Sequence, residues 1–237
     1  MPDRWRIEER AEPASRLHDS WPSVEGDDRT PAVAVCLPTG PAVVLGSTQD
    51  REVVDSGRAE DAGLAVVRRR SGGGAVLVTP GDPVWIDIWV PVGHARWSTD
   101  VTHAFEWLGT IWAEAIRGLG LDGVEVQGPG PGACTRWSSL VCFGGVGAGE
   151  VTIGGRKVVG LSQRRNRHGA WFHSACALHW NSTPLLDVLS LAVEQRTAAR
   201  EELAGVVVGL ADAAGESGID PLPTGAAVVA AFLDLLS

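Results

Sequence analysis

The sequence has very little lysine and no long apolar segment. Lys157 is the only lysine among 20 basic residues, in a chain of 237 residues. An arginine-rich chain keeps a lysine where a compact ammonium on a flexible stem does work that a planar guanidinium cannot do. The alternative is that one lysine remains by chance, so the residues around Lys157 have to decide between the two.

Other absences exclude whole classes of protein. No run of 18 or more apolar residues occurs, which excludes a typical membrane-spanning helix. The N-terminal residues carry both signs of charge without the apolar segment of a secretory signal, so we expect a cytoplasmic protein that does not bind membranes. The net charge of −9 argues against nonspecific nucleic-acid binding, which needs a basic surface.

Cysteine and histidine lack the spacing of metal or disulfide sites. The four cysteines form no Cys-x-x-Cys pair, and a domain of this length does not depend on disulfides, so free thiols are expected. The histidines show no metal-ligand spacing with cysteine or carboxylate residues, which predicts no structural zinc. The cysteines are Cys36, Cys134, Cys142 and Cys176.

The order of apolar and turn residues predicts an α+β domain with a mainly antiparallel mixed sheet flanked by helices. Residues 1–30 read as a loosely ordered arm with a short helix near 15–20, residues 31–183 as the main domain, and residues 184–237 as a helical segment packed on it. Asp50 is the expected cap of a helix to residue 62, and Asp100 that of a helix to residue 119. Strands are expected at 33–37, 42–45, 64–69, 75–78, 84–90, 150–153, 156–163 and 170–180.

Two segments indicate chemistry, RRRSGGGAV at 68–76 and GGRKVVGLSQRR at 154–165. Three successive glycines allow backbone amides to approach an anion or a ligand, although a flexible hairpin loop is the simpler interpretation of this run alone. Strand alternation places Lys157 on one face with Leu161 and Gln163, and Gly160 and Ser162 on the other.

Together the two segments resemble the catalytic domain of lipoate-protein ligases and octanoyltransferases, within the biotin/lipoate ligase superfamily. The resemblance runs from about residue 43 to 178. It implies that Lys157 contacts the carboxylate and phosphate of an acyl-adenylate, formed from lipoate or octanoate with ATP and Mg²⁺. It also implies an acyl and adenylate pocket lined by Gly46, Arg69, Arg70, Ser71, Gly72, Gly73, Gly74, Ala75, Gly160, Ser162, Gln163 and His173.

The resemblance leaves three activities open. The first is ATP-dependent ligation of a lipoyl or octanoyl group to a lysine of a lipoyl-carrier protein, for which SGGGAV is the typical loop. The second is an ATP-independent transferase in which the Cys142 thiolate attacks an acyl-carrier thioester, because a Cys-Phe loop precedes the lysine at a similar interval in such enzymes. The expected acceptors are acyltransferase subunits of 2-oxoacid dehydrogenases and the glycine cleavage H protein, and acyl carrier protein is the expected donor for the second activity.

The third possibility follows from positions where the chain departs from the family pattern. Val78 stands where relatives have histidine, Asp82 where they have asparagine, and Ser174 where they have glycine. These changes are compatible with a catalytically impaired homologue that still binds an acyl group or an adenylate.

Overall fold

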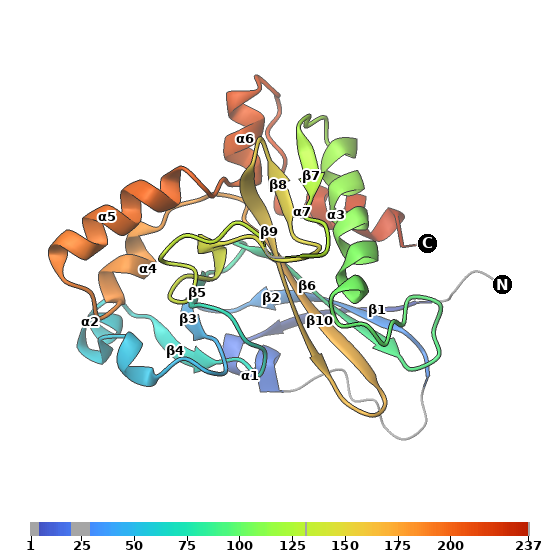
Figure 1. Ribbon diagram of the computed structural model, residues 1–237, viewed down its shortest axis with the longest axis horizontal. Coiled ribbons are helices and arrows are strands. Elements are labelled where there is room, and N and C mark those ends of the chain that lie inside the picture. Colours follow the sequence, from blue (N-terminus) through green and yellow to red (C-terminus); the bar gives the residue numbers. More distant parts are fainter. Residues whose placement is uncertain (1–4, 20–28, 131, 237) are drawn as a thin grey trace.

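A seven-stranded sheet forms the centre of the computed structural model, which describes residues 5–19, 29–130 and 132–236 (Figure 1). The strand order is β1-β2-β6-β10-β9-β8-β7, with β1 and β2 parallel and every other neighbouring pair antiparallel. A second sheet has the order β4-β3-β5. The expected α+β class and mainly antiparallel sheet are therefore confirmed.

The elements have the following bounds. The strands are β1 (Arg6–Glu12), β2 (Ala32–Pro38), β3 (Ala42–Leu45), β4 (Ala65–Arg68), β5 (Val76–Val78), β6 (Val84–Pro91), β7 (Val124–Val126), β8 (Val151–Ile153), β9 (Arg156–Arg165) and β10 (Gly169–Cys176). The α-helices are α1 (Ala14–Asp19), α2 (Ser56–Asp61), α3 (Glu106–Gly118), α4 (Thr183–Val188), α5 (Val193–Ala204), α6 (Leu210–Glu216) and α7 (Gly225–Asp234). Short 3-10 turns cover Arg51–Val53, His103–Phe105 and Cys142–Gly144.

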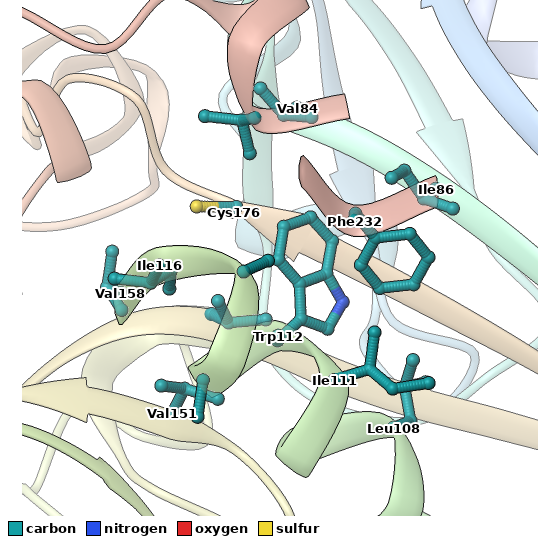
Figure 2. Packing of buried hydrophobic residues seen from close by; sticks show 14 of the residues in the cluster. Val84, Ile86, Leu108, Ile111, Trp112, Ile116, Val151, Val158, Cys176 and Phe232 are labelled. Carbon is teal, nitrogen blue, oxygen red and sulfur yellow. The ribbon is translucent and has the colours of Figure 1, made fainter. Parts of the chain in front are cut away.

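Strand β6 separates the core from the functional side of the molecule. Its alternate residues Val84, Ile86, Ile88 and Val90 belong to the main apolar cluster, beneath α3 and α7. Figure 2 shows Trp112 of α3 against Phe232 of α7, with ring centroids 4.6 Å apart. Because side chains alternate along a strand, the residues between them face the opposite side, where the small sheet and α1 lie.

Two expectations about the first half of the chain are corrected. Residues 6–12, expected in a loosely ordered arm, form β1 and pair with β2, whereas residues 1–4 and 20–28 lie outside the described residues. The expected helix at 50–62 begins only at Ser56, capped by Asp55, whose side chain accepts a hydrogen bond from the Arg58 amide. Val54 prevents an earlier start, because it is buried in extended conformation and bridges Leu189.

The helix expected from residue 100 also starts later, at Glu106, after a 3-10 turn. The Asp100 carboxylate accepts from the amides of Thr102 and His103 and so caps that turn. Among the described residues, no helix has both the length and the apolar character to cross a bilayer.

Candidate active site

A cavity lies between the small sheet, β9 and β10, on the face of the large sheet away from α3. We call it the Cys142 cavity. Strands β6, β9 and β10 and the segments after β4 and before β8 all contribute side chains to it. Its polar lining consists of His18, Arg69, Cys142, Ser162, His173 and Ser174, and its apolar lining of Val76, Val78, Pro83, Trp85, Phe143, Leu161 and Ala175, with Gly160 between them.

Two glycines allow the segments around this cavity to touch through their backbones. A Cβ on Gly46 would lie 1.8 Å from the Gly73 carbonyl oxygen, and one on Gly74 would lie 2.6 Å from the Val141 carbonyl carbon. The Cys142 amide then donates to the Ala75 carbonyl at 2.9 Å. The predicted glycine loop is therefore packed against the Cys142 segment, and close backbone approach is what Gly46 and Gly74 permit.

Arg69 occupies the inside of the glycine loop. Its buried guanidinium donates to the carbonyls of Gly72 and Gly74 at 2.8 and 2.9 Å, and to Val44 at 3.4 Å. The charge of Arg69 thus fixes the loop. Arg70 is turned away, with its guanidinium exposed and 3.8 Å from Asp19.

Cys142 is the thiol of this site. Its Sγ lies 3.8 Å from the Arg69 guanidinium. A Cβ added to Gly73 would lie 4.0 Å from the same sulfur, so the glycine loop passes close to the thiol. The other thiols differ: Cys134 is exposed in a loop, and burial raises the pKa of both Cys36 and Cys176. Of the four cysteines, all within the described chain, Cys142 lines the cavity.

Lys157 lies directly beneath the Cys142 segment and is 1% exposed. Its Nζ is 2.6 Å from Glu150 Oε2 and donates to the carbonyls of Cys142 and Gly145 at 3.1 and 2.9 Å. All three ammonium hydrogens therefore have protein acceptors. The aromatic ring of Phe143 lies 5.2 Å from the ammonium.

The predicted alternation along β9 is wrong at Lys157. A β-bulge interrupts the register with β8, because Val151 pairs with Val159 while Thr152 pairs with Lys157. The extra residue in β9 shifts the alternation, so the side chains that precede it lie on the opposite face from the one that a regular strand would give them. Lys157 consequently shares a side with Gly160, at which a Cβ would be 3.5 Å from Lys157 Cε.

Some of the other predicted site residues lie at the cavity and some point away from it. Ser71 and Ser162 join the glycine loop to β9 through a 2.9 Å hydrogen bond between their hydroxyls. Gln163 points away from the cavity, because its Nε2 donates to the Val101 carbonyl at 2.6 Å, on the exposed side of the strand. The structure thus does not bring Gln163 or Arg70 to the cavity.

The floor of the cavity carries a histidine held by a buried carboxylate. His173 Nδ1 is 2.8 Å from Asp87 Oδ1, which also accepts from Trp85 Nε1 at 2.6 Å. A carboxylate only accepts, so Nδ1 carries the proton, and in the neutral ring of His173 the other nitrogen is the one with acceptor character. His18 of α1 lies beside it, with ring centroids 5.4 Å apart. Burial, then the charges of His173 and Arg69, lower the pKa of His18 well below 6.5.

A neighbouring cavity of about 190 Å³ shares Val76, Pro83 and Phe143 with the Cys142 cavity. Its polar lining includes Asp82, whose carboxylate oxygens accept from the amides of Leu178 and His179 at 3.0 Å each. Burial raises the pKa of Asp82. The departure from the family pattern at this position therefore has a local role, in holding the turn after β10.

Three residues of the site were missed from the sequence. Asp87 sits within an apolar run and Glu150 at the end of a glycine-rich loop, and neither position has a distinguishing neighbour pattern. Only the interruption of a buried strand by a carboxylate could have marked Asp87. His18 fell in the segment expected to be an arm.

Comparisons with known proteins agree with the sequence motifs. A family model described as the lipoyl protein ligase A/B catalytic domain matches residues 23–233. An octanoyltransferase LipM from Moorella thermoacetica is 30% identical over 164 residues, covering 68% of this chain and 59% of that protein. An octanoyltransferase LipM from Carboxydothermus hydrogenoformans is 29% identical over 67% of this chain and 57% of that protein. The chain thus matches less than two thirds of the length of these relatives.

Solved structures share the fold at lower identity. A bi-partite lipoate protein ligase from Thermoplasma acidophilum, described with its E2 lipoyl domain, superimposes with a TM-score of 0.70 at 18% identity, covering 97% of this chain and 80% of that one. A lipoate-protein ligase A bound with ATP gives a TM-score of 0.68 at 18% identity, with coverage of 99% and 83%.

Proposed function

We propose that this chain, which belongs to the lipoyl protein ligase A/B catalytic domain family, is an octanoyltransferase that uses Cys142 as its nucleophile and needs no ATP. The observation that carries the proposal is the position of Cys142 Sγ on the wall of a largely apolar cavity, beside the Arg69 guanidinium. Two LipM octanoyltransferases at 30% and 29% identity support it.

The reaction proceeds in two balanced steps. In the first, the Cys142 thiol loses its proton and the thiolate attacks the carbonyl carbon of an octanoyl thioester on a carrier protein; an Sγ–C bond forms, the C–S bond to the carrier breaks, and the carrier thiolate leaves and takes up that proton. In the second, the neutral amine of an acceptor lysine attacks the same carbon. The C–N bond forms, the C–Sγ bond breaks, and the proton lost by the amine passes through His173 to the departing Cys142 thiolate.

The residues of the cavity have separate tasks in these steps. Val76, Val78 and Trp85 provide apolar surface for an acyl chain. Arg69 places a positive charge 3.8 Å from the sulfur, where the thiolate carries negative charge. The acceptor nitrogen of His173, oriented by Asp87, is suited to receive a proton from the attacking amine.

ATP-dependent ligation, the leading expectation from the sequence, is the second candidate. The SGGGAV loop favours it. Against it, the ammonium of Lys157 is held by Glu150 and by the carbonyls of Cys142 and Gly145, so it is not directed to a phosphate. We therefore derive no step through ATP.

The test offers the purified protein octanoyl-carrier protein without ATP, or octanoate with ATP and Mg²⁺, and follows acylation of an apo lipoyl domain by intact mass. The proposal predicts transfer in the first arm and an octanoyl adduct on the enzyme. Cys142→Ser abolishes both, whereas Cys134→Ser, at an exposed loop cysteine, changes neither.

Two other results would contradict the proposal. Acylation only with ATP, surviving in Cys142→Ser and lost in Lys157→Arg, identifies a ligase. No acylation in either arm, together with measurable binding of octanoate, identifies a non-catalytic homologue.

Repeating the transfer with lipoyl in place of octanoyl donors shows which of the two acyl groups the enzyme prefers. The lipoyl domain of a 2-oxoacid dehydrogenase can be compared with glycine cleavage H protein as acceptor.

A further inference from the structure

We propose that Glu150 is a positioning residue for the acyl-transfer reaction, acting through Lys157 to hold the Cys142 segment in place. This inference rests on the proposed function. It assigns to Lys157 a task different from the substrate contact that the family resemblance implied. Glu150 itself lies outside both sequence motifs.

Glu150 is buried at the end of the segment that begins at Cys142, with its side chain 8% exposed. Oε2 accepts from the Gly147 amide at 2.7 Å and lies 2.6 Å from Lys157 Nζ, and Oε1 accepts from the Leu161 amide at 2.9 Å. The carboxylate therefore attaches its own segment, through Gly147, to two positions on β9, Lys157 and Leu161. It is also the charge partner that a buried ammonium requires.

The ammonium completes the connection to the nucleophile. Lys157 donates to the carbonyls of Cys142 and Gly145, so the residue that bears the thiol is attached to β9 through its own backbone. The Cys142 sulfur lies on the side of Arg69, 3.8 Å from its guanidinium, and close to Gly73. Without the charge of Glu150, the ammonium would be buried and unpaired, and it would lose its fixed position below these carbonyls.

This arrangement accounts for the solitary lysine. Three acceptors converge on one nitrogen, from Glu150, Cys142 and Gly145, which suits the three rotatable donors of an ammonium. A planar guanidinium needs acceptors spread in one plane and more room. Lys157 is 1% exposed, so that room is absent unless the segment moves.

The experiment compares four full-length proteins: wild type, Glu150→Gln, Lys157→Met, and the double variant. Glu150→Gln keeps the side-chain shape and removes the charge. We expect kcat for octanoyl transfer to fall about 100-fold with KM nearly unchanged, since a displacement of about 1 Å at a reacting group has an effect of this order. Both single variants should also show a lowered Tm, because each leaves one buried charge without its partner.

The double variant separates positioning from simple stability. Removing both charges relieves the unpaired charge, so Tm should return toward the wild-type value, while kcat stays low because nothing attaches the Cys142 carbonyl to β9. If kcat recovers together with Tm, the pair is only structural and the proposal is wrong. Wild-type kcat in Glu150→Gln would overturn it as well.

A matched control and a second readout keep the test independent of the proposed reaction. Arg156, the residue before Lys157, forms an exposed ion pair with Glu216. Glu216→Gln breaks this pair and should change neither kcat nor Tm appreciably. Hydrogen exchange of the backbone amides in residues 142–150 should be faster in Glu150→Gln than in Glu216→Gln. Equal exchange rates in the two variants would refute the positioning role of Glu150, whether or not octanoyl transfer is detected. Absence of octanoyl transfer in the wild type would refute the proposed function and not the positioning role.

Discussion

Replacing Gly46 by alanine should displace the glycine loop and weaken both stability and activity. The added Cβ would lie 1.8 Å from the Gly73 carbonyl oxygen, whereas ordinary contacts begin at 3.4 Å, so one backbone must move by about 1.6 Å. Neither side of this contact is a flexible side chain. Overpacking in a buried site costs about 1–3 kcal/mol, and a backbone clash belongs near the upper end.

For a chain of this length, about 3 kcal/mol corresponds to a decrease in Tm of roughly 6–12 °C. The same movement separates the Gly73 region from Cys142 Sγ, so we expect kcat for octanoyl transfer to fall by about 100-fold. Thermal unfolding followed by circular dichroism gives the first quantity, and acylation of a lipoyl domain gives the second.

Gly40→Ala is the matched control, because a Cβ at Gly40 has no atom within 4 Å and no positive φ is recorded there. Its free energy of unfolding should change by no more than about 0.5 kcal/mol in either direction, the range of a neutral surface substitution. If Gly46→Ala unfolds at the same temperature as Gly40→Ala and keeps its activity, the close approach of the two backbones does not exist in solution.

Three further predictions concern the floor of the cavity and the exposed side of β9. Asp87→Asn should lower kcat at least tenfold and shift its pH profile, because an amide can donate to His173 and so favour the other tautomer; an unchanged profile would refute the orienting role. The pKa of His18 is lower in the folded protein than in the unfolded chain, so as the pH falls below about 6.5 the unfolded chain takes up a proton at His18 that the folded protein does not. The free energy of unfolding should therefore decrease as the pH falls below about 6.5. In His18→Phe the dependence of unfolding free energy on pH should be flatter in denaturant titrations, and an equal slope would contradict the assignment. Gln163→Ala should leave kcat and KM within about twofold, since its amide bonds Val101 outside the cavity; a large loss of activity would show that β9 is placed wrongly.

The sequence predicted the elements whose patterns are local. The apolar spacing of the helix that contains Trp112 and the runs that form β6 and β10 depend on neighbours within a few residues, so these elements were found, although the helix begins at Glu106 and not at residue 100, and β10 ends at Cys176 and not at residue 180. The start of α2 was missed because Val54 pairs with Leu189, a contact between segments far apart in the chain. Strand β1 was missed for a related reason, since its alternating burial depends on a parallel partner more than 20 residues away.

The site shows the same division between local pattern and distant contact. Lys157 drew attention as the solitary lysine, the glycine loop gained a functional interpretation only together with the Lys157 segment, and Cys142 was found through the resemblance to transferases in which a Cys-Phe loop precedes the lysine. The partner of Lys157 was not recognisable, since a single extra residue in β9 decides which side of the sheet its ammonium reaches. Had the strand been regular, Lys157 would face away from Gly160, and Glu150 could not join it to the carbonyl of Cys142. The bulge, rather than the lysine alone, is therefore what brings Lys157 to the Cys142 segment, and a substitution that removed it should separate the ammonium from the carbonyls of Cys142 and Gly145 while both sequence motifs remain intact.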